Sequence, residues 1–155
     1  QPIQHMLYLY NWSGQPWKAE QRIREVMDKF YTGHPDGYGG DEDNGQTSAW
    51  YVFSALGFYP VCPATDQYIL GTPLFKKAEV SMSDGKTLLI NAPDNGRENF
   101  YVSGMKVNGR KYTRTYLEHD LLRKGTVIDF TMSDEPSKNR SVSQQDRPYS
   151  FSNQR

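Results

Sequence analysis

The chain has 155 residues, enough for one domain or two small ones, and its 18 basic and 18 acidic residues give a formal net charge of zero. This balance argues against the basic patch that binds nucleic acid and against an acidic tail for a cationic partner. No apolar run approaches the roughly 18 residues that span a membrane, and the single cysteine, Cys62, excludes a disulfide within the chain.

The first third of the chain has helical patterns. Residues 5–12 are apolar almost all round, which predicts a short buried helix. Residues 17–31 are amphipathic and predict a helix with one apolar face. Its apolar positions, spaced at i, i+3, i+4 and i+7, are Ile23, Val26, Met27 and Phe30. Its charged positions, expected to face solvent, are Lys18, Glu20, Arg22, Arg24, Glu25 and Asp28. A very apolar helix is expected over 49–56, ended by Gly57.

After Pro60 the pattern changes to short strands with turn residues between them, which favours a β-sandwich. The predicted strands are 67–70, 78–82, 87–92, 100–107, 110–116 and 126–132. Asn108 and Gly109 between two strands indicate a hairpin. The order of helices then strands predicts an α+β fold, divided into a helical region 1–62, a strand region 63–133 and an irregular tail 134–155.

An acidic loop over residues 39–46 precedes the apolar helix. It carries three consecutive acids between glycines, followed by Thr47 and Ser48 as candidate N-caps. If the loop is extended, Asp41 and Asp43 point to one side and Glu42 to the other. Two converging carboxylates suit either acid/base hydrolysis or the binding of a hard cation.

Two further interpretations of the loop are an EF-hand and a helix cap. Counted from Asp41, an EF-hand would place ligands or glycine where Gly45, Gln46 and Val52 stand, so the EF-hand pattern fails at three places. A solvated cluster that caps the helix and is favoured by its dipole remains open from the residues alone.

Several motifs resemble glycoside hydrolase family 92, the calcium-dependent exo-α-mannosidases. They are GDEDNGQ at 40–46, SAWYVFSALGFYPV at 48–61, YNWSGQPW at 10–17, GTPLF at 71–75 and RPYSFS at 147–152. Enzymes of this family are much longer, so the chain resembles their C-terminal portion. The resemblance implies the last helices of an (α/α)6 barrel followed by an antiparallel β-sandwich-like layer.

The resemblance also implies roles for the acids. Inverting glycosidases use one carboxylic acid to protonate the leaving oxygen and a second carboxylate to activate water, roughly 6.5–9.5 Å apart. By position, Asp43 is the general base and Asp41 its partner, although Asp41 stands where many members have Asn. Glu42 is expected to be structural. The family's general acid is a Glu upstream of the residues matched here.

Further site residues follow from the same resemblance. Calcium binds mostly through upstream ligands, and Gln1 stands before Pro2 where the family has a Glu, so Gln1 is the one metal-ligand candidate and lacks the charge. His5 holds the second place of a His-His pair, with Gln4 at the first. His5 and Gln46 are candidates for contact with the sugar; the alternatives are a buried, hydrogen-bonded His5 and a Gln46 that bonds the loop backbone.

The predicted function is a calcium-dependent, inverting exo-α-mannosidase that acts on α-1,2 linkages of mannose-containing glycans, as in N-glycan degradation. The partner is the N-terminal remainder of the same enzyme, and the expected location is secreted or periplasmic. Alone, the chain is expected to be inactive and to expose an apolar patch that includes Met6, Leu9, Val52 and Phe53. The alternative is a non-catalytic carbohydrate-binding or interaction module built on the aromatic strands. A cleft lined by Asp41 and Asp43 would favour the enzyme.

Overall fold

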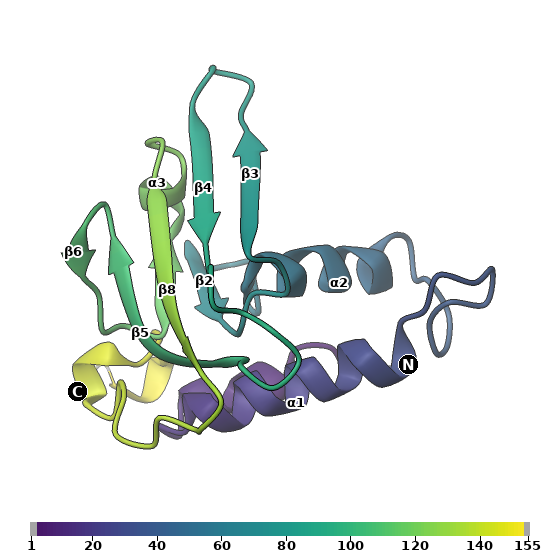
Figure 1. The fold of residues 1–155 in the computed structure, drawn as a ribbon, viewed down its shortest axis with the longest axis horizontal. Helices are drawn as coiled ribbons and strands as arrows, with labels where there is room; N and C mark the ends of the chain where they lie inside the picture. Colours follow the sequence, from purple (N-terminus) through teal and green to yellow (C-terminus); the bar gives the residue numbers. More distant parts are fainter. Residues whose placement is uncertain (1–2, 154–155) are drawn as a thin grey trace.

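The structure is a computed structural model that describes residues 3–153, so Gln1 lies outside the described residues. The helical part comprises a 3-10 helix η1 (Met6–Asn11) and the helices α1 (Pro16–Phe30) and α2 (Gln46–Leu56). The two long helices run across the view of Figure 1, and the strands stand steeply against them at one end. Within residues 3–153 no helix is long and apolar enough to cross a membrane.

The strands form two sheets, which together with the helices give the predicted mixed α+β fold. The smaller sheet has the order β1 (Phe58–Tyr59), β2 (Gln67–Leu70) and β7 (Tyr116–Glu118). The larger sheet has the order β3 (Lys77–Ser81), β4 (Thr87–Asn91), β8 (Val127–Ser133), β5 (Tyr101–Val107) and β6 (Arg110–Lys111). A short helix α3 (His119–Leu122) follows β7.

Two strand predictions are wrong. The layer is not purely antiparallel, because β4 and β8 pair in parallel, with Leu89 opposite Val127. The chain between them first forms the hairpin β5–β6 and then leaves for the smaller sheet, and such a crossover makes a parallel pair possible. The predicted strand 110–116 is divided between the two sheets, since β6 ends at Lys111 and β7 begins at Tyr116.

Two hydrophobic clusters hold the fold together. One lies between the sheets, where Phe58, Leu70 and Leu117 from the smaller sheet pack with the buried faces of β4, β5 and β8. The other lies under the helices and includes Ile23 and Trp50. Because Ile69 and Tyr116 of the smaller sheet belong to the second cluster, that sheet joins the helices to the strands.

The N-terminal helix is less buried than its composition predicts. Met6 and Leu9 of η1 are 52% and 45% exposed, and Val52 of α2 is 58% exposed. Phe53 is half-buried against the cluster between the sheets. Met6, Leu9 and Val52 are therefore exposed as predicted, while Phe53 is exposed only in part.

The expectation that every charged side chain of α1 faces solvent is wrong for Glu20 and Arg24, which are 1% and 7% exposed. Glu20 forms an ion pair with Arg140, and its other oxygen accepts a hydrogen bond from the backbone N–H of Val102 at 3.1 Å. The Arg24 guanidinium donates to the carbonyl of Pro73 at 2.6 Å.

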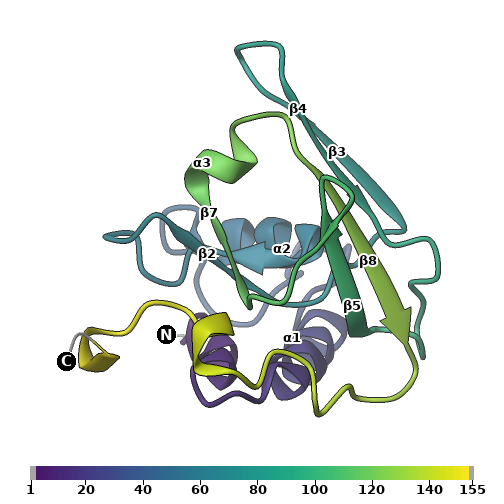
Figure 2. The same ribbon diagram turned by 90° about the vertical axis from the view of Figure 1, so that its left-hand side faces the viewer.

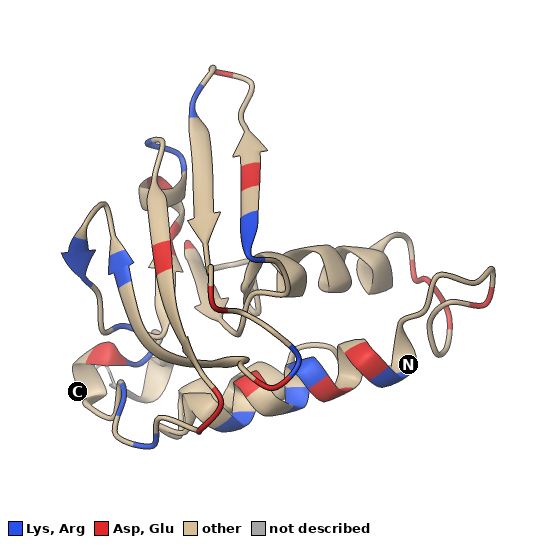
Figure 3. Cartoon of the chain, viewed as in Figure 1, with Lys and Arg blue, Asp and Glu red and all other residues tan. Residues whose placement is uncertain are grey.

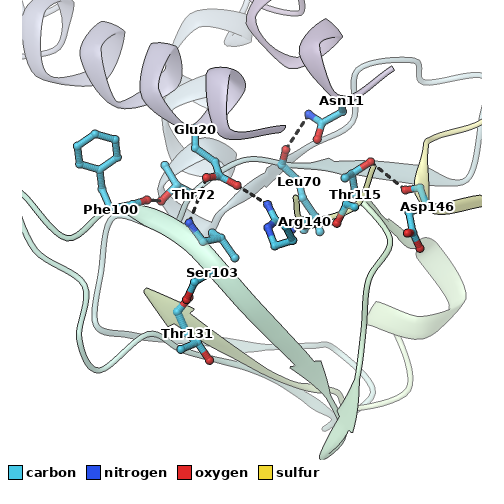
Figure 4. A network of polar contacts seen from close by, with 12 residues as sticks. Asn11, Glu20, Leu70, Thr72, Phe100, Ser103, Thr115, Thr131, Arg140 and Asp146 are labelled. Carbon is cyan, nitrogen blue, oxygen red and sulfur yellow. Dashed lines mark hydrogen bonds and ion pairs between the residues drawn. The ribbon is translucent and has the colours of Figure 1, made fainter. Parts of the chain in front are cut away.

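Residues 134–153 are mostly irregular, as predicted, with two short 3-10 helices, η2 (Gln144–Asp146) and η3 (Phe151–Asn153). They are nevertheless attached to the rest of the fold. Figure 4 shows the ion pair between Glu20 and Arg140 and the bond from Thr115 to Asp146. The same segment runs beside the N-terminal helices (Figure 2), where the Trp12 indole donates to the carbonyl of Tyr149 at 2.8 Å.

Candidate active-site loop

The acidic loop connects α1 to α2 and lies at one end of the molecule. Figure 3 shows its acidic residues gathered at the start of α2, at the same end as the N-terminus. A bridge between Tyr31 and Tyr38 and a hydrogen bond from the Thr32 N–H to the carbonyl of Gly37 at 2.6 Å close a turn over residues 31–38, just before the acidic loop. The three acids follow this closed turn, in the segment that leads directly into α2.

The second half of the loop is a left-handed turn, so the expectation of an extended loop is wrong there. Asp43, Asn44 and Gly45 have φ angles of 55°, 56° and 90°. Aspartate and asparagine tolerate this region better than other residues with a Cβ, but strained backbone of this kind still costs about 1–3 kcal/mol per residue and is frequent at active sites. The orientation of the Asp43 side chain is therefore set by the turn and not by strand-like alternation.

Glu42 supplies the cap of α2, and the predicted N-caps Thr47 and Ser48 lie inside the first turn. Gly45 occupies the N-cap position. The Glu42 carboxylate accepts from the Ser48 N–H at 3.1 Å and from the Ser48 hydroxyl at 2.5 Å. These bonds from Ser48, with a further one from Tyr38, lower the pKa of Glu42. A carboxylate at this place is favoured by the helix dipole, so the helix-capping role predicted for the acidic cluster applies to Glu42.

Asp41 and Asp43 take part in the loop through their backbone carbonyls. The Asp41 carbonyl accepts from the Thr47 hydroxyl at 2.9 Å, and the Asp43 carbonyl accepts from the Gln46 N–H at 3.2 Å. Residue Asp41 is exposed and Asp43 is half-buried. Neither residue is fully buried, although one carboxylate oxygen of Asp43 is enclosed by the protein.

A buried glutamine that the sequence did not single out for a role, Gln4, joins the N-terminal segment to the loop. Its amide oxygen accepts from the Gln46 amide at 3.1 Å, and its own amide N–H donates to the Thr47 hydroxyl at 3.3 Å. The Trp50 indole donates to the Gln4 backbone carbonyl at 2.9 Å. The sequence did contain one signal for it, because Gln4 stands at the first position of the His-His pair of the resembled family.

The two proposed sugar-contacting residues are both exposed. His5 precedes η1, so the alternative of a buried, hydrogen-bonded histidine is wrong. Gln46 begins α2, and its side chain bonds the side chain of Gln4 and not the loop backbone. His5 follows Gln4 directly in the chain, which keeps it close to the acidic loop.

Aromatic residues support the loop from behind. The Tyr31 ring stacks on Trp50 and on Tyr51, with centroid distances of 5.5 and 4.8 Å. Its hydroxyl donates to the carbonyl of Thr47 at 3.1 Å. Burial, with a contribution from the charge of Glu42, raises the pKa of Tyr31 to about 12, so this hydroxyl stays protonated and remains a donor at neutral pH.

A pocket of about 370 Å³ lies beside the loop, between η1, α1 and α2. Its lining residues are Ile3, Gln4, Met6, Leu7, Val26, Phe30, Tyr31, Gly39 and Trp50. Asp41 and Asp43 are not among them, so this pocket is not the cleft that would have favoured an enzyme. Its mostly apolar walls suit the packing of apolar side chains better than the hydroxyls of a sugar.

The fit to calcium can be tested on the described residues. Calcium takes six to eight oxygen ligands in proteins. Within residues 3–153 no group of three or more His, Cys, Asp or Glu side chains is placed to hold a metal ion. The acidic loop alone therefore does not fit calcium, and Gln1 belongs to the residues that are not described.

Comparison with known proteins identifies the family. Residues 1–134 match the glycosyl hydrolase family 92 catalytic domain. A protein of Arthroderma benhamiae named as an uncharacterized secreted glycosidase is 26% identical over 133 residues, which are 84% of this chain and 17% of that protein.

Solved structures from Bacteroides thetaiotaomicron agree with this match. A family GH92 inverting mannosidase is 49% identical, with a TM-score of 0.92 over 98% of this chain and 21% of its own. A family GH92 α-mannosidase in complex with mannoimidazole is 41% identical, with a TM-score of 0.93 over 97% of this chain and 20% of its own. The chain thus spans about a fifth of the length of these relatives, and it belongs to glycosyl hydrolase family 92.

Proposed function

We propose that this chain supplies the general-base loop of an inverting exo-α-mannosidase. The observation that carries the proposal is the left-handed turn at Asp43, Asn44 and Gly45, which fixes a half-buried aspartate beside an exposed one at the start of α2. The 49% identity to a protein described as an inverting mannosidase supports the same reaction.

In this reaction a water molecule attacks the anomeric carbon of mannose on the face opposite the departing oxygen. Asp43 removes a proton from that water as the new C–O bond forms, and a carboxylic acid elsewhere in the enzyme protonates the leaving oxygen. Asp41 lies two residues away and acts as the partner of Asp43, and His5 and Gln46 contact the sugar hydroxyls from the same end of the chain. Glu42 holds the loop on the helix.

The second half of the site belongs to the remainder of the enzyme. The apolar surface around the pocket, with Ile3, Met6 and Phe30 each more than half exposed, is covered in the complete protein by apolar side chains of that remainder. This contact brings the general acid to the acidic loop. The proposed substrates are α-1,2-linked mannosides of glycans such as N-glycans, and the proposed location is outside the cell, as the name of the fungal relative supports.

A carbohydrate-binding module gains no support from the aromatic residues of the strands. Phe58, Tyr101 and Tyr116 are at most 9% exposed. Their ring faces pack within the protein, where a sugar cannot stack on them. Tyr59 and Tyr68 are half-buried, and their rings already stack on Tyr8 and His119. The enzyme is therefore the better-supported function.

Activity of the isolated 155-residue chain provides one test. It is expected to release no mannose from an α-1,2-mannobioside with calcium present, because inversion needs an acid and a base on opposite faces of the bond. The complete enzyme, assayed under the same conditions, is the positive control. Mannose release by the isolated chain, abolished by Asp43→Asn, would show that the acid lies within it.

Calcium dependence is a separate proposal, with ligands from the residues outside 3–153. The complete enzyme is expected to lose activity on treatment with a chelator and to regain it with calcium but not with zinc, a metal that prefers His and Cys ligands. The measurement is mannose release before and after each addition. Full activity in the chelator, or recovery with zinc alone, would contradict it.

A further inference from the structure

We infer that Gln4 is a positioning residue for the general base: it acts through Thr47 to fix the acidic loop in its active conformation. The inference rests on the proposed function of that loop. It follows from a hydrogen-bond chain of two consecutive bonds, from Gln4 to Thr47 and from Thr47 to the backbone of Asp41.

Both bonds of this hydrogen-bond chain donate towards Asp41. The Gln4 amide donates to the Thr47 hydroxyl at 3.3 Å, and that hydroxyl donates its single proton to the carbonyl of Asp41 at 2.9 Å. A hydroxyl that accepts one bond is polarised to donate a stronger one, so the two bonds strengthen each other. Without Gln4 the Thr47 hydroxyl loses its acceptor role and bonds Asp41 less strongly.

Burial restricts the motion of the residues in this hydrogen-bond chain. Thr47 is 1% exposed and Gln4 is 7% exposed, so water competes little for the hydrogen bond between them. Gln4 is held at two further points, by the Gln46 amide at 3.1 Å and by the Trp50 indole at 2.9 Å. The Thr47 N–H also donates to the carbonyl of Glu42 at 3.1 Å, so Thr47 bonds the loop on both of its polar groups.

The loop needs such a restraint. Its turn at Asp43 and Asn44 is left-handed at two residues that carry a Cβ, a conformation that persists only where the surroundings enforce it. The bonds to Asp41 and Glu42 restrain the residues immediately before that turn. A shift of about 1 Å in a catalytic group can lower a rate by about 100-fold, so a loose loop would slow the chemical step while sugar binding continues.

The test compares variants of the complete enzyme on an α-1,2-mannobioside. Gln4→Met keeps the side-chain length and removes the amide, and Thr47→Val keeps the shape and removes the hydroxyl. Each is expected to lower kcat by about 10- to 100-fold. Thr47→Val should leave KM little changed, the pattern of a lost contribution to the chemical step, whereas Gln4→Met also frees Gln46, a proposed sugar contact, and is expected to raise KM as well. Thr47→Ser, which restores the hydroxyl, is expected to recover most of kcat.

The double variant separates this role from a general structural one. Because both residues act through the same hydrogen-bond chain, Gln4→Met combined with Thr47→Val is expected to lower kcat no further than the worse single variant. Gln145→Met, at an exposed residue of the C-terminal segment, is the matched control and is expected to leave kcat unchanged. Should Gln4→Met not fold, the comparison of Thr47→Val with Thr47→Ser decides.

Three results would overturn the inference: an unchanged kcat in folded Gln4→Met, an equal kcat in Thr47→Val and Thr47→Ser, or effects of the two substitutions that multiply. Asp43→Asn is measured beside them. A large loss in Asp43→Asn with none in Gln4→Met would remove the role of Gln4 and leave the function of the loop intact. Normal activity in Asp43→Asn would instead remove the proposed function.

Discussion

Asp43→Asn in the complete enzyme is expected to lower kcat by about 10²- to 10⁴-fold, the contribution of a positioned general base. Stability should change little, because Asn keeps the shape of Asp and tolerates the left-handed backbone that Asp43 adopts, with φ at 55°. The measurements are the rate of mannose release and the melting temperature, Tm.

The matched control is Asp36→Asn, an exposed aspartate in the same connection between α1 and α2. It loses a charge near the loop but has no proposed part in the reaction, so its kcat should stay at the wild-type value. Near-normal turnover in Asp43→Asn, or an equal loss in Asp36→Asn, would rule out Asp43 as the base.

The largest expected effect on stability comes from Arg140→Met. The substitution leaves the Glu20 carboxylate, which is 1% exposed, with the backbone N–H of Val102 as its remaining hydrogen-bond donor among those described here. Removal of one partner of a buried ion pair typically costs about 3–5 kcal/mol of folding free energy. The complete enzyme should therefore melt at a lower temperature, as measured by scanning calorimetry.

The loss should depend on pH. Burial raises the pKa of Glu20 and the charge of Arg140 opposes that rise, so the substitution raises the pKa further. A carboxyl whose pKa is higher in the folded state binds a proton more tightly there, and folding is favoured as the pH falls. The Tm of Arg140→Met should thus lie nearer the wild-type value at about pH 5 than at about pH 7.5.

The double variant Glu20→Gln with Arg140→Met is the control for that mechanism. It removes both charges, so it should be more stable than Arg140→Met at neutral pH and should lose the extra dependence on pH. A single variant as stable as the wild type, or a loss equal at both pH values, would contradict a charged Glu20 held by Arg140.

Local patterns predicted the elements whose causes lie nearby in the chain. The apolar spacing of Ile23 and Met27 gave α1 nearly to its ends. Gly57 ends α2 in the left-handed conformation, at a φ of 99°, as expected of a glycine after a helix. Asn108 and Gly109 form the β5–β6 turn.

Long-range features could not be predicted in this way. Glu20 has the spacing of a solvent-exposed position on α1. Its burial depends on the ion pair with Arg140, which lies 120 residues later in the chain. The parallel pairing of β4 with β8 likewise depends on where the intervening chain goes. Neither local propensity nor period contains that information.

The position of the acidic loop in the chain was predictable from the sequence, but its backbone conformation was not. The motif at 40–46 pointed to Asp41 and Asp43, and the structure places them at the start of α2 as expected. The left-handed turn was missed because the flanking glycines are compatible with several backbone conformations. Gln4 was not given a role because its contact with Thr47 spans 43 residues.

Azide rescue of Asp43→Gly tests the base assignment most directly. Glycine adopts the positive φ of this position without strain and leaves space where the carboxylate was, and azide needs no base to attack carbon. An activated α-mannoside treated with the variant and azide should give β-mannosyl azide, the inverted product, at a rate that rises with azide concentration. No rescue by azide, or a mannosyl azide of retained α configuration, would contradict Asp43 as the general base of an inverting mannosidase.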